Sequence, residues 1–148
     1  MTTEIRKVTD EAQIRKLIDN RARAINNKDI NGLMSNYAPD VVEFDAVNPL
    51  QHIGLDGSRK RAEQWLSAYQ GLIGYDIRDL SITAGEEVAF CHFLYHISGT
   101  MTNGSKVNMW VRATICYRKI EGSWLVTHEH NSVPFDGESG QASLDLKP

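Results

Sequence analysis

The sequence predicts an α+β protein in which helices come first and an antiparallel sheet follows. Up to about Gly74 the apolar residues recur mostly at helical spacing, whereas after Tyr75 they alternate with a period of two, as in strands. The pair Asn103-Gly104 suits a type I′ turn between two of the later segments. We therefore expect a cone-shaped, curved antiparallel sheet packed on three N-terminal helices, with a pocket between the layers.

Helical spacing predicts three segments in the first half of the chain. The first helix is expected to have Thr9 or Asp10 as its N-cap. Its apolar stripe consists of Ile14, Leu17, Ile18, Ala22 and Ile25. A short second helix follows Asp29, because aspartate is a favourable N-cap. A third helix is expected to be capped by Ser58 and to end near residues 71–74, where glycines interrupt the pattern.

The strands are predicted from alternation and from the turn residues between them. A short strand at residues 41–45 precedes the third helix. The later strands are expected at residues 77–83, 88–100, 106–120 and 124–133. Because the turns between the last three are short, these strands should form an antiparallel meander.

Composition limits the classes of function. The chain has 148 residues, which suits a single domain, and its net charge of −3 argues against a basic nucleic-acid binder. We expect a cytoplasmic protein without membrane contact, since the N-terminus does not resemble a secretion signal and no long apolar run is present. Cys91 and Cys116 are expected to be inert thiols. Residues 137–148 are rich in Gly, Ser and Asp and are expected to form a mobile tail.

Alternation sorts the side chains of the last three strands into two kinds of face. The mixed faces carry His92 and His96, then Trp110 and Arg112, then His128, His130 and Ser132. The apolar faces carry Ala89, Cys91, Phe93, Tyr95 and Ile97, then Val107, Met109, Val111, Ala113, Ile115 and Tyr117. Because a pocket combines aromatic and titratable groups, we expect the mixed faces to line the cone. The apolar faces would then be buried in a homodimer that forms through the sheet.

Four segments of the chain resemble one protein family. Residues 122–136 (GSWLVTHEHNSVPFD) resemble the last strand of SnoaL-like proteins, which belong to the nuclear transport factor 2-like superfamily with ketosteroid isomerase and scytalone dehydratase. Residues 37–45 resemble the first strand, residues 110–114 the penultimate strand, and residues 98–104 the hairpin before it. The resemblance covers about residues 9–136. It implies one domain within residues 1–136 with a cystatin-like α+β barrel fold.

These features together favour a cofactor-free enzyme that transfers a proton on a small, mostly apolar carbonyl or hydroxy compound, as an isomerase, cyclase or dehydratase. A base would remove a proton beside a carbonyl group, and a hydrogen-bond donor would stabilise the enolate oxygen. We expect His130 or Asp45 as the base, and the resemblance places Asp45 at the pocket. The expected donors are Arg112, His92 and His128. Further contacts with the substrate are expected from His128, Trp110, Ser132, Phe44, Trp65 and Tyr69.

The sequence leaves alternatives open for the function of the protein and for the roles of its histidines and Arg112. The same fold can serve as a non-catalytic ligand-binding or assembly module, without catalysis. His128 and His130 have a spacing that can chelate Zn²⁺ with His92 as a third ligand, but nothing in the spacing specifies that third ligand, so no metal is expected. Arg112 either contacts a substrate or forms a salt bridge with Asp45. The donor pair of ketosteroid isomerase, a tyrosine and a protonated acid, has no recognisable counterpart, so steroid isomerisation is not predicted.

Overall fold

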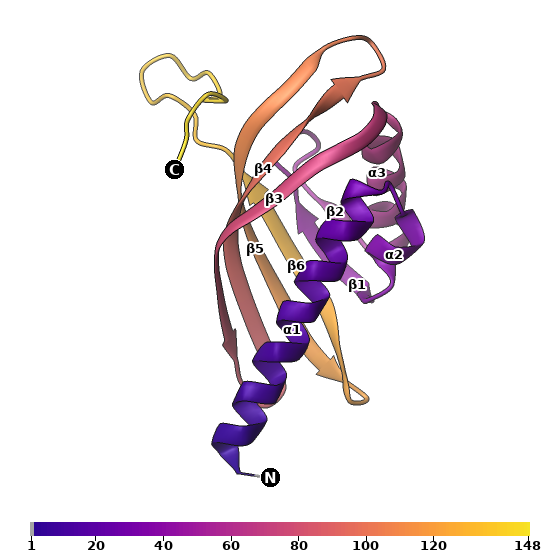
Figure 1. The fold of residues 1–148 in the computed structure, drawn as a ribbon, viewed down its shortest axis with the longest axis vertical. Coiled ribbons are helices and arrows are strands. Elements are labelled where there is room, and N and C mark those ends of the chain that lie inside the picture. Colours follow the sequence, from indigo (N-terminus) through magenta and orange to yellow (C-terminus); the bar gives the residue numbers. More distant parts are fainter. Residues whose placement is uncertain (1) are drawn as a thin grey trace.

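The computed structural model describes residues 2–148, and its helices lie on one side of a curved sheet (Figure 1). The helices are α1 (Thr3–Asn26), α2 (Ile30–Met34) and α3 (Leu55–Ser67). The strands are β1 (Tyr37–Phe44), β2 (His52–Ile53), β3 (Tyr69–Ala84), β4 (Val88–Met101), β5 (Lys106–Ile120) and β6 (Ser123–Ser132). The predicted α+β class, with three helices packed on a curved sheet, is confirmed.

All six strands form one sheet with the order β2-β1-β6-β5-β4-β3. β3 to β6 form an antiparallel meander, whereas β1 runs parallel to β6. The last strand of the meander therefore lies beside the first strand of the chain, and the sheet remains open between β2 and β3. This arrangement brings residues near 43 and residues near 129 side by side although they are far apart in the sequence.

α1 begins directly after Thr2, whose side-chain oxygen accepts a hydrogen bond from the backbone of the first turn at 3.2 Å. The prediction of an N-cap at Thr9 or Asp10 is wrong. Asp10 lies inside the helix, 2% exposed, and accepts hydrogen bonds from Lys119 on β5 and Trp124 on β6. These bonds hold α1 against the sheet. No helix among residues 2–148 has the length and apolar character needed to cross a bilayer.

The region around α3 also differs from the prediction. α3 begins after Gly54, and Ser58 is not its cap but is fully buried within the helix. β3 follows α3 almost at once and includes the glycines that were expected to end the helix. At Gly74 an added Cβ would lie 2.1 Å from Oγ of Ser98 on β4. A side chain at this position would therefore require Ser98 to move, which favours glycine.

The apolar faces of β4 and β5 form the core under the helices. Their most buried residues are Ala89, Cys91, Phe93, Tyr95, Ile97, Val111, Ala113, Ile115 and Tyr117. They belong to one cluster with Ile14, Ile18 and Ile25 of α1, each of which is at most 1% exposed. The assignment of these faces to a homodimer interface is thus wrong, because the helices of the same chain cover them (Figure 1).

A β-bulge in β6 changes which of its side chains point inward. Tyr117 of β5 is opposite Val126, but the preceding residue, Cys116, is opposite His128. Thr127 is therefore an extra residue, and the alternation of β6 shifts by one position after it. As a result Glu129 points into the core instead of away from it. Asn131, two residues later, also points inward.

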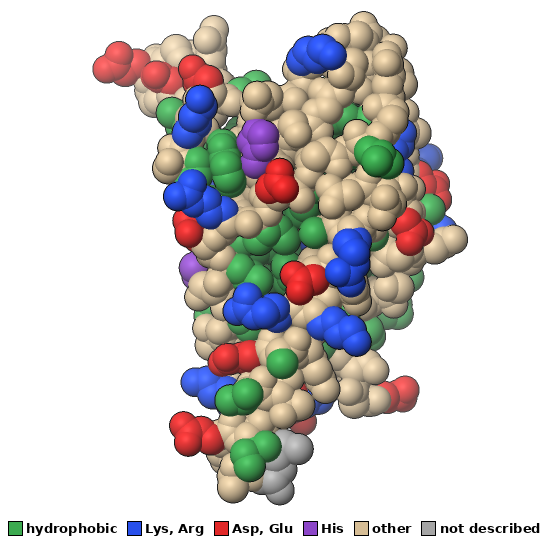
Figure 2. All heavy atoms as spheres, viewed as in Figure 1, with side chains coloured by type: hydrophobic (Ala, Val, Ile, Leu, Met, Phe, Trp, Pro, Cys, Tyr) green, Lys and Arg blue, Asp and Glu red, His purple; other side chains and the backbone are tan. Residues whose placement is uncertain are grey.

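The C-terminal segment turns back on itself after β6. Phe135 and Ala142 form an isolated bridge, and the side chain of Asp136 accepts backbone hydrogen bonds from Glu138 and Ser139. Figure 2 shows acidic side chains gathered on this projecting segment at the upper left. The predicted mobility of residues 137–148 stays a prediction.

Candidate active site

Seven predicted site residues lie on the sheet face that points away from the helices, which we call the open face. They are Phe44, His92, Trp110, Arg112, His128, His130 and Ser132. Arg112 and both His92 and His130 are exposed to solvent. The prediction that these three residues meet Asp45 in one cavity is wrong. The helices need the apolar faces of β4 and β5, and alternation then turns the mixed faces outward.

Contacts on the open face are local. Arg112 Nε donates to Ser132 Oγ at 3.0 Å, and Phe44 packs edge-on against His128 and His130 at centroid distances of 4.7 and 5.4 Å. His128 Nδ1 lies 2.7 Å from the carbonyl oxygen of a β1 residue. Within residues 2–148 no three His, Cys, Asp or Glu side chains are grouped so that they could hold a metal ion. The catalytic and substrate-binding roles of the open-face residues stay predictions.

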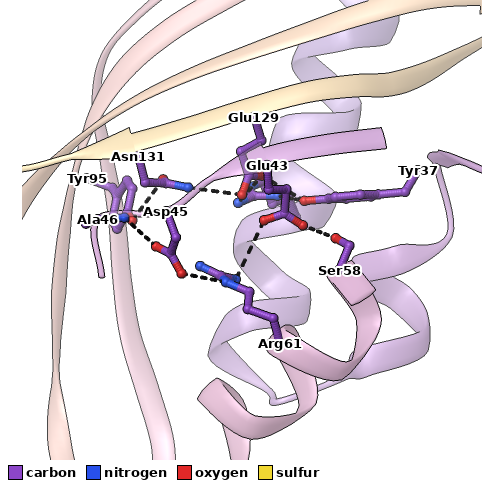
Figure 3. A network of polar contacts seen from close by, with 10 residues as sticks. Tyr37, Glu43, Asp45, Ala46, Ser58, Arg61, Tyr95, Glu129 and Asn131 are labelled. Atoms are coloured by element: carbon purple, nitrogen blue, oxygen red, sulfur yellow. Dashed lines mark hydrogen bonds and ion pairs between the residues drawn. The ribbon is translucent and has the colours of Figure 1, made fainter. Parts of the chain in front are cut away.

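On the helix-covered side, Asp45 forms an ion pair with Arg61 of α3. Arg61 Nε donates to Asp45 Oδ2 at 2.6 Å, and the backbone N–H of Ala46 donates to Asp45 Oδ1 at 2.7 Å (Figure 3). The side chains of Asp45 and Arg61 are 11% and 18% exposed, so solvent still reaches the pair. The predicted salt bridge between Asp45 and Arg112 is therefore wrong, because Arg61 is the partner.

Aromatic side chains adjoin this ion pair. The guanidinium group of Arg61 lies over the ring of Trp65, 5.6 Å from its centroid. Trp65 in turn meets Tyr69 edge to face at 6.1 Å. Two of the predicted site residues, Asp45 and Trp65, thus contact an arginine that was not predicted, and a third, Tyr69, adjoins Trp65. The arrangement combines a carboxylate, a guanidinium donor and two adjoining aromatic rings.

Deeper under the helices, Glu129 is 1% exposed and fully hydrogen-bonded. Arg21 Nη2 and the hydroxyl of Tyr37 each lie 2.7 Å from Glu129 Oε1, and Asn131 Nδ2 donates to Oε2 at 3.0 Å. The hydroxyl of Tyr95 donates to Asn131 Oδ1 at 3.1 Å. A buried carboxylate with this many donors is stabilised in its charged form.

Glu43 connects the two groups (Figure 3). Its side chain is next to Glu129, its Oε1 accepts a hydrogen bond from Ser58, and its Oε2 lies 4.0 Å from Arg61 Nη1. Burial, followed by the negative charge of Glu129, raises the pKa of Glu43 to about 8. Burial alone would also raise the pKa of Glu129, but Arg21 and Arg61 outweigh it and hold that pKa well below its usual value.

The two groups of charged residues around Glu43 contain equal numbers of negative and positive charges when Glu43 is neutral. The carboxylates of Asp45 and Glu129 then match the guanidinium groups of Arg21 and Arg61. Ionised Glu43 would add an unmatched negative charge in a buried environment, which is costly. This balance of charges agrees with the raised pKa of Glu43, which lies behind the ion pair of Asp45 and Arg61.

Comparisons with known proteins identify the family. A family model described as the SnoaL-like domain matches residues 14–136, well over half of the chain. The chain belongs to the SnoaL-like family. The crystal structure of an NTF2-like protein of unknown function from Pseudomonas putida KT2440 is 33% identical to it. That match covers 95% of this chain and 98% of that one, with a TM-score of 0.88. The resemblance read from the sequence is thus confirmed.

More distant structures share the fold with this SnoaL-like protein. An NTF2-like superfamily protein from Salmonella enterica serovar Typhimurium LT2 is 15% identical, with coverage of 92% and 99% and a TM-score of 0.79. A protein from Streptomyces avermitilis, provisionally called a dehydratase of the NTF2-like family, is 16% identical, with coverage of 85% and 97% and a TM-score of 0.75. A comparison with curated proteins gives no match.

Four charged residues of the SnoaL-like domain's interior were not predicted from the sequence: Arg21, Glu43, Arg61 and Glu129. Glu43 shares a strand face with Asp45, and this alternation was a signal that could have identified it. Glu129 could not be found in this way, because the bulge at Thr127 reverses the alternation. The two arginines lie on helices far away in the sequence, and only the packing shows which carboxylates they meet.

Proposed function

We propose that this SnoaL-like protein is a cofactor-free enzyme that moves a proton on a small, mostly apolar carbonyl or hydroxy compound. Asp45 is the base, and Arg61 is the donor to the oxygen that becomes negative. The ion pair between them supports the proposal most directly. Nε of Arg61 donates to Asp45 and Nη1 faces Glu43 Oε2 at 4.0 Å, so Nη2, which has no partner among residues 2–148, remains for a ligand oxygen.

The chemistry follows from the charges. When Asp45 takes a proton from a carbon beside a carbonyl group, its negative charge passes to the carbonyl oxygen as an enolate forms. The Arg61 guanidinium can contact both oxygens, so its positive charge stays paired throughout the step. Trp65 and Tyr69 would contact the apolar part of the compound. A carboxylate base of this kind contributes roughly a hundredfold to ten-thousandfold to the rate.

Deuterium exchange tests this function without knowledge of the product. Small ketones, enones and hydroxy acids are incubated with the protein in D₂O, and NMR follows the loss of the protons beside the carbonyl or hydroxyl group. We expect exchange with at least one class, and a loss of at least about a hundredfold in Asp45→Asn. Asp40→Asn is the matched control, because Asp40 is an exposed carboxylate within β1, the strand that Asp45 directly follows. Equal exchange in both variants would exclude Asp45 as the base.

The alternative is a non-catalytic binding module that uses the same site. The Arg61 guanidinium, which lies over the Trp65 ring, favours a ligand with a carboxylate attached to an aromatic or aliphatic group. Ligands that raise the melting temperature without any deuterium exchange would support this function. Loss of the shift in Arg61→Met would assign the binding to this site.

We also propose that two copies pair through the open face. Large apolar side chains are exposed there, including Phe44 at 37% and Phe90 at 46%. A face-to-face dimer would bury them and should exceed about 1,000 Å² in total. Light scattering should give a dimer that Phe90→Asp converts to a monomer. Val8→Asp, at an exposed apolar position on α1, should leave it intact. A monomeric unmodified protein at micromolar concentration would refute the pairing.

A further inference from the structure

Glu43 has an unusual position between two groups of charges. It is 2% exposed, and its Oε2 has no hydrogen-bond partner among residues 2–148 although Arg61 Nη1 is only 4.0 Å away. An ionised carboxylate would draw the guanidinium into direct contact, since charge-assisted bonds of this kind are short and strong. Glu43 instead lies beside Glu129, and the side-chain hydrogen bond between these two carboxyl groups requires a proton on one of them, while Oε1 of Glu43 accepts from Ser58.

Every element packed around Glu43 contributes to its electrostatic environment. Glu129 of β6 opposes ionisation, whereas Arg61 of α3 and Arg21 of α1 favour it. Tyr37 lies on the same strand, and its hydroxyl is committed to Glu129. His52 of β2 is directly opposite Glu43 in the β1–β2 ladder. Burial and the neighbouring Glu129 carboxylate outweigh the cations, so the pKa of Glu43 is raised to about 8.

We propose that Glu43 is a positioning residue that remains protonated beside Glu129 and so leaves Arg61 to Asp45 and to the ligand. This inference rests on the proposed acid–base function of Asp45 and Arg61. Ionised Glu43 competes for the same guanidinium, which it can reach with Oε2. Arg61 then moves inward, Asp45 loses its partner, and the ligand oxygen loses its donor. The site is thus assembled when Glu43 holds its proton and disassembled when it loses it.

Two measurements on the ligand-free protein test the protonation and its consequence. The infrared spectrum at pH 7 should show a protonated-carboxyl band that disappears as the pH rises through about 8 and is absent in Glu43→Gln. The NMR signal of the Arg61 Nε proton, assigned by its loss in Arg61→Lys, should shift over the same pH range. It should not shift in Glu43→Gln, because the amide stays neutral.

The pH profile of deuterium exchange tests the consequence for catalysis. From pH 7 to pH 9 the wild-type rate should fall about tenfold, as expected when a required proton is lost near the middle of this range. In Glu43→Gln the ratio of the rates at the two pH values should change less than twofold. Glu63→Gln is the matched control, since Glu63 lies on α3 with a side chain that is 52% exposed. It should keep the wild-type profile.

The outcomes separate this inference from the proposed function. If no compound exchanges but the infrared band and the Arg61 signal titrate as expected, the acid–base function fails and the positioning by Glu43 stands. If exchange occurs but Glu43→Gln keeps both the band and the wild-type pH profile, the inference about Glu43 is wrong. The Arg61 signal of the wild-type protein tests the inference even if Glu43→Gln does not fold, because a signal that does not shift as the pH rises through about 8 would contradict it.

Discussion

The open face and the helix-covered face of the sheet use titratable residues in opposite ways. On the open face Arg112 and His130 are exposed, and their neighbours are a serine hydroxyl and an aromatic ring. On the covered face Glu129 is 1% exposed and has three donors, including Arg21. On the covered face, burial and the neighbouring charges raise the pKa of Glu43 and lower that of Glu129. Burial, more than residue type, therefore indicates where chemistry can take place.

The largest difference between the faces should appear in stability. Arg21→Met leaves the Glu129 carboxylate buried without its ion-pair partner, and we expect a loss of about 3–5 kcal/mol in the free energy of unfolding. Urea unfolding at pH 7 measures it. Arg112→Met on the open face removes a hydrogen bond to Ser132 and should cost about 0.5 kcal/mol or less. Equal losses in the free energy of unfolding for the two variants would show that burial does not make the charges of the covered face more important for stability.

A second difference concerns pH. The pKa of Glu43 rises from 4.5 to about 8 in the folded protein, so between these values the folded state holds a proton that the unfolded state releases. The free energy of unfolding should therefore decrease as the pH rises through this window, by at most about 1.4 kcal/mol per pH unit.

Glu43→Gln lacks this contribution. Its stability relative to the wild-type protein should increase steadily from about pH 5 to pH 8 in urea unfolding experiments. Glu63→Gln serves as the control and should give a constant difference, because its carboxylate is exposed. A constant difference for Glu43→Gln would mean that Glu43 is not protonated in the folded state.

The smallest effect is expected for a histidine of the open face. His130→Gln should change the free energy of unfolding by about 0.5 kcal/mol or less, because His130 is exposed and makes only edge-on contacts, with Phe44 and His128. The same variant also distinguishes the two faces as catalytic sites. A large decrease in deuterium exchange would favour His130 as the base and would contradict the assignment to Asp45.

Much of the fold could be predicted because it depends on local patterns. The change from helical spacing to alternation near Tyr75 is visible in the sequence, and Asn103-Gly104 marks a hairpin that the structure confirms between β4 and β5. The glycines of β3 were misinterpreted for a tertiary reason. Gly74 looks like the end of a helix in the sequence, but its role is to let β3 pass close to Ser98.

The candidate site was predicted only in part. Asp45, Trp65 and Tyr69 were identified, and the structure brings them together. Alternation by itself determined which side chains of β4 and β5 share a face, and these sets were correct. It could not determine which face the helices cover, because a period of two is unchanged when the strand is turned over. Tertiary packing decided that point, since α1 and α3 need an apolar surface.

Packing also decided the chemistry under the helices. Thr127 adds one residue to β6, and this single step turns Glu129 inward toward Arg21. The neighbour of Glu129 on β1 is Glu43, which the parallel pairing of the first and last strands brings there. Sequence patterns describe each segment separately, whereas an ionisation state depends on charges from four segments in one buried volume. For this reason the sequence determined the elements and their faces, and only the tertiary structure determined which carboxyl group keeps its proton.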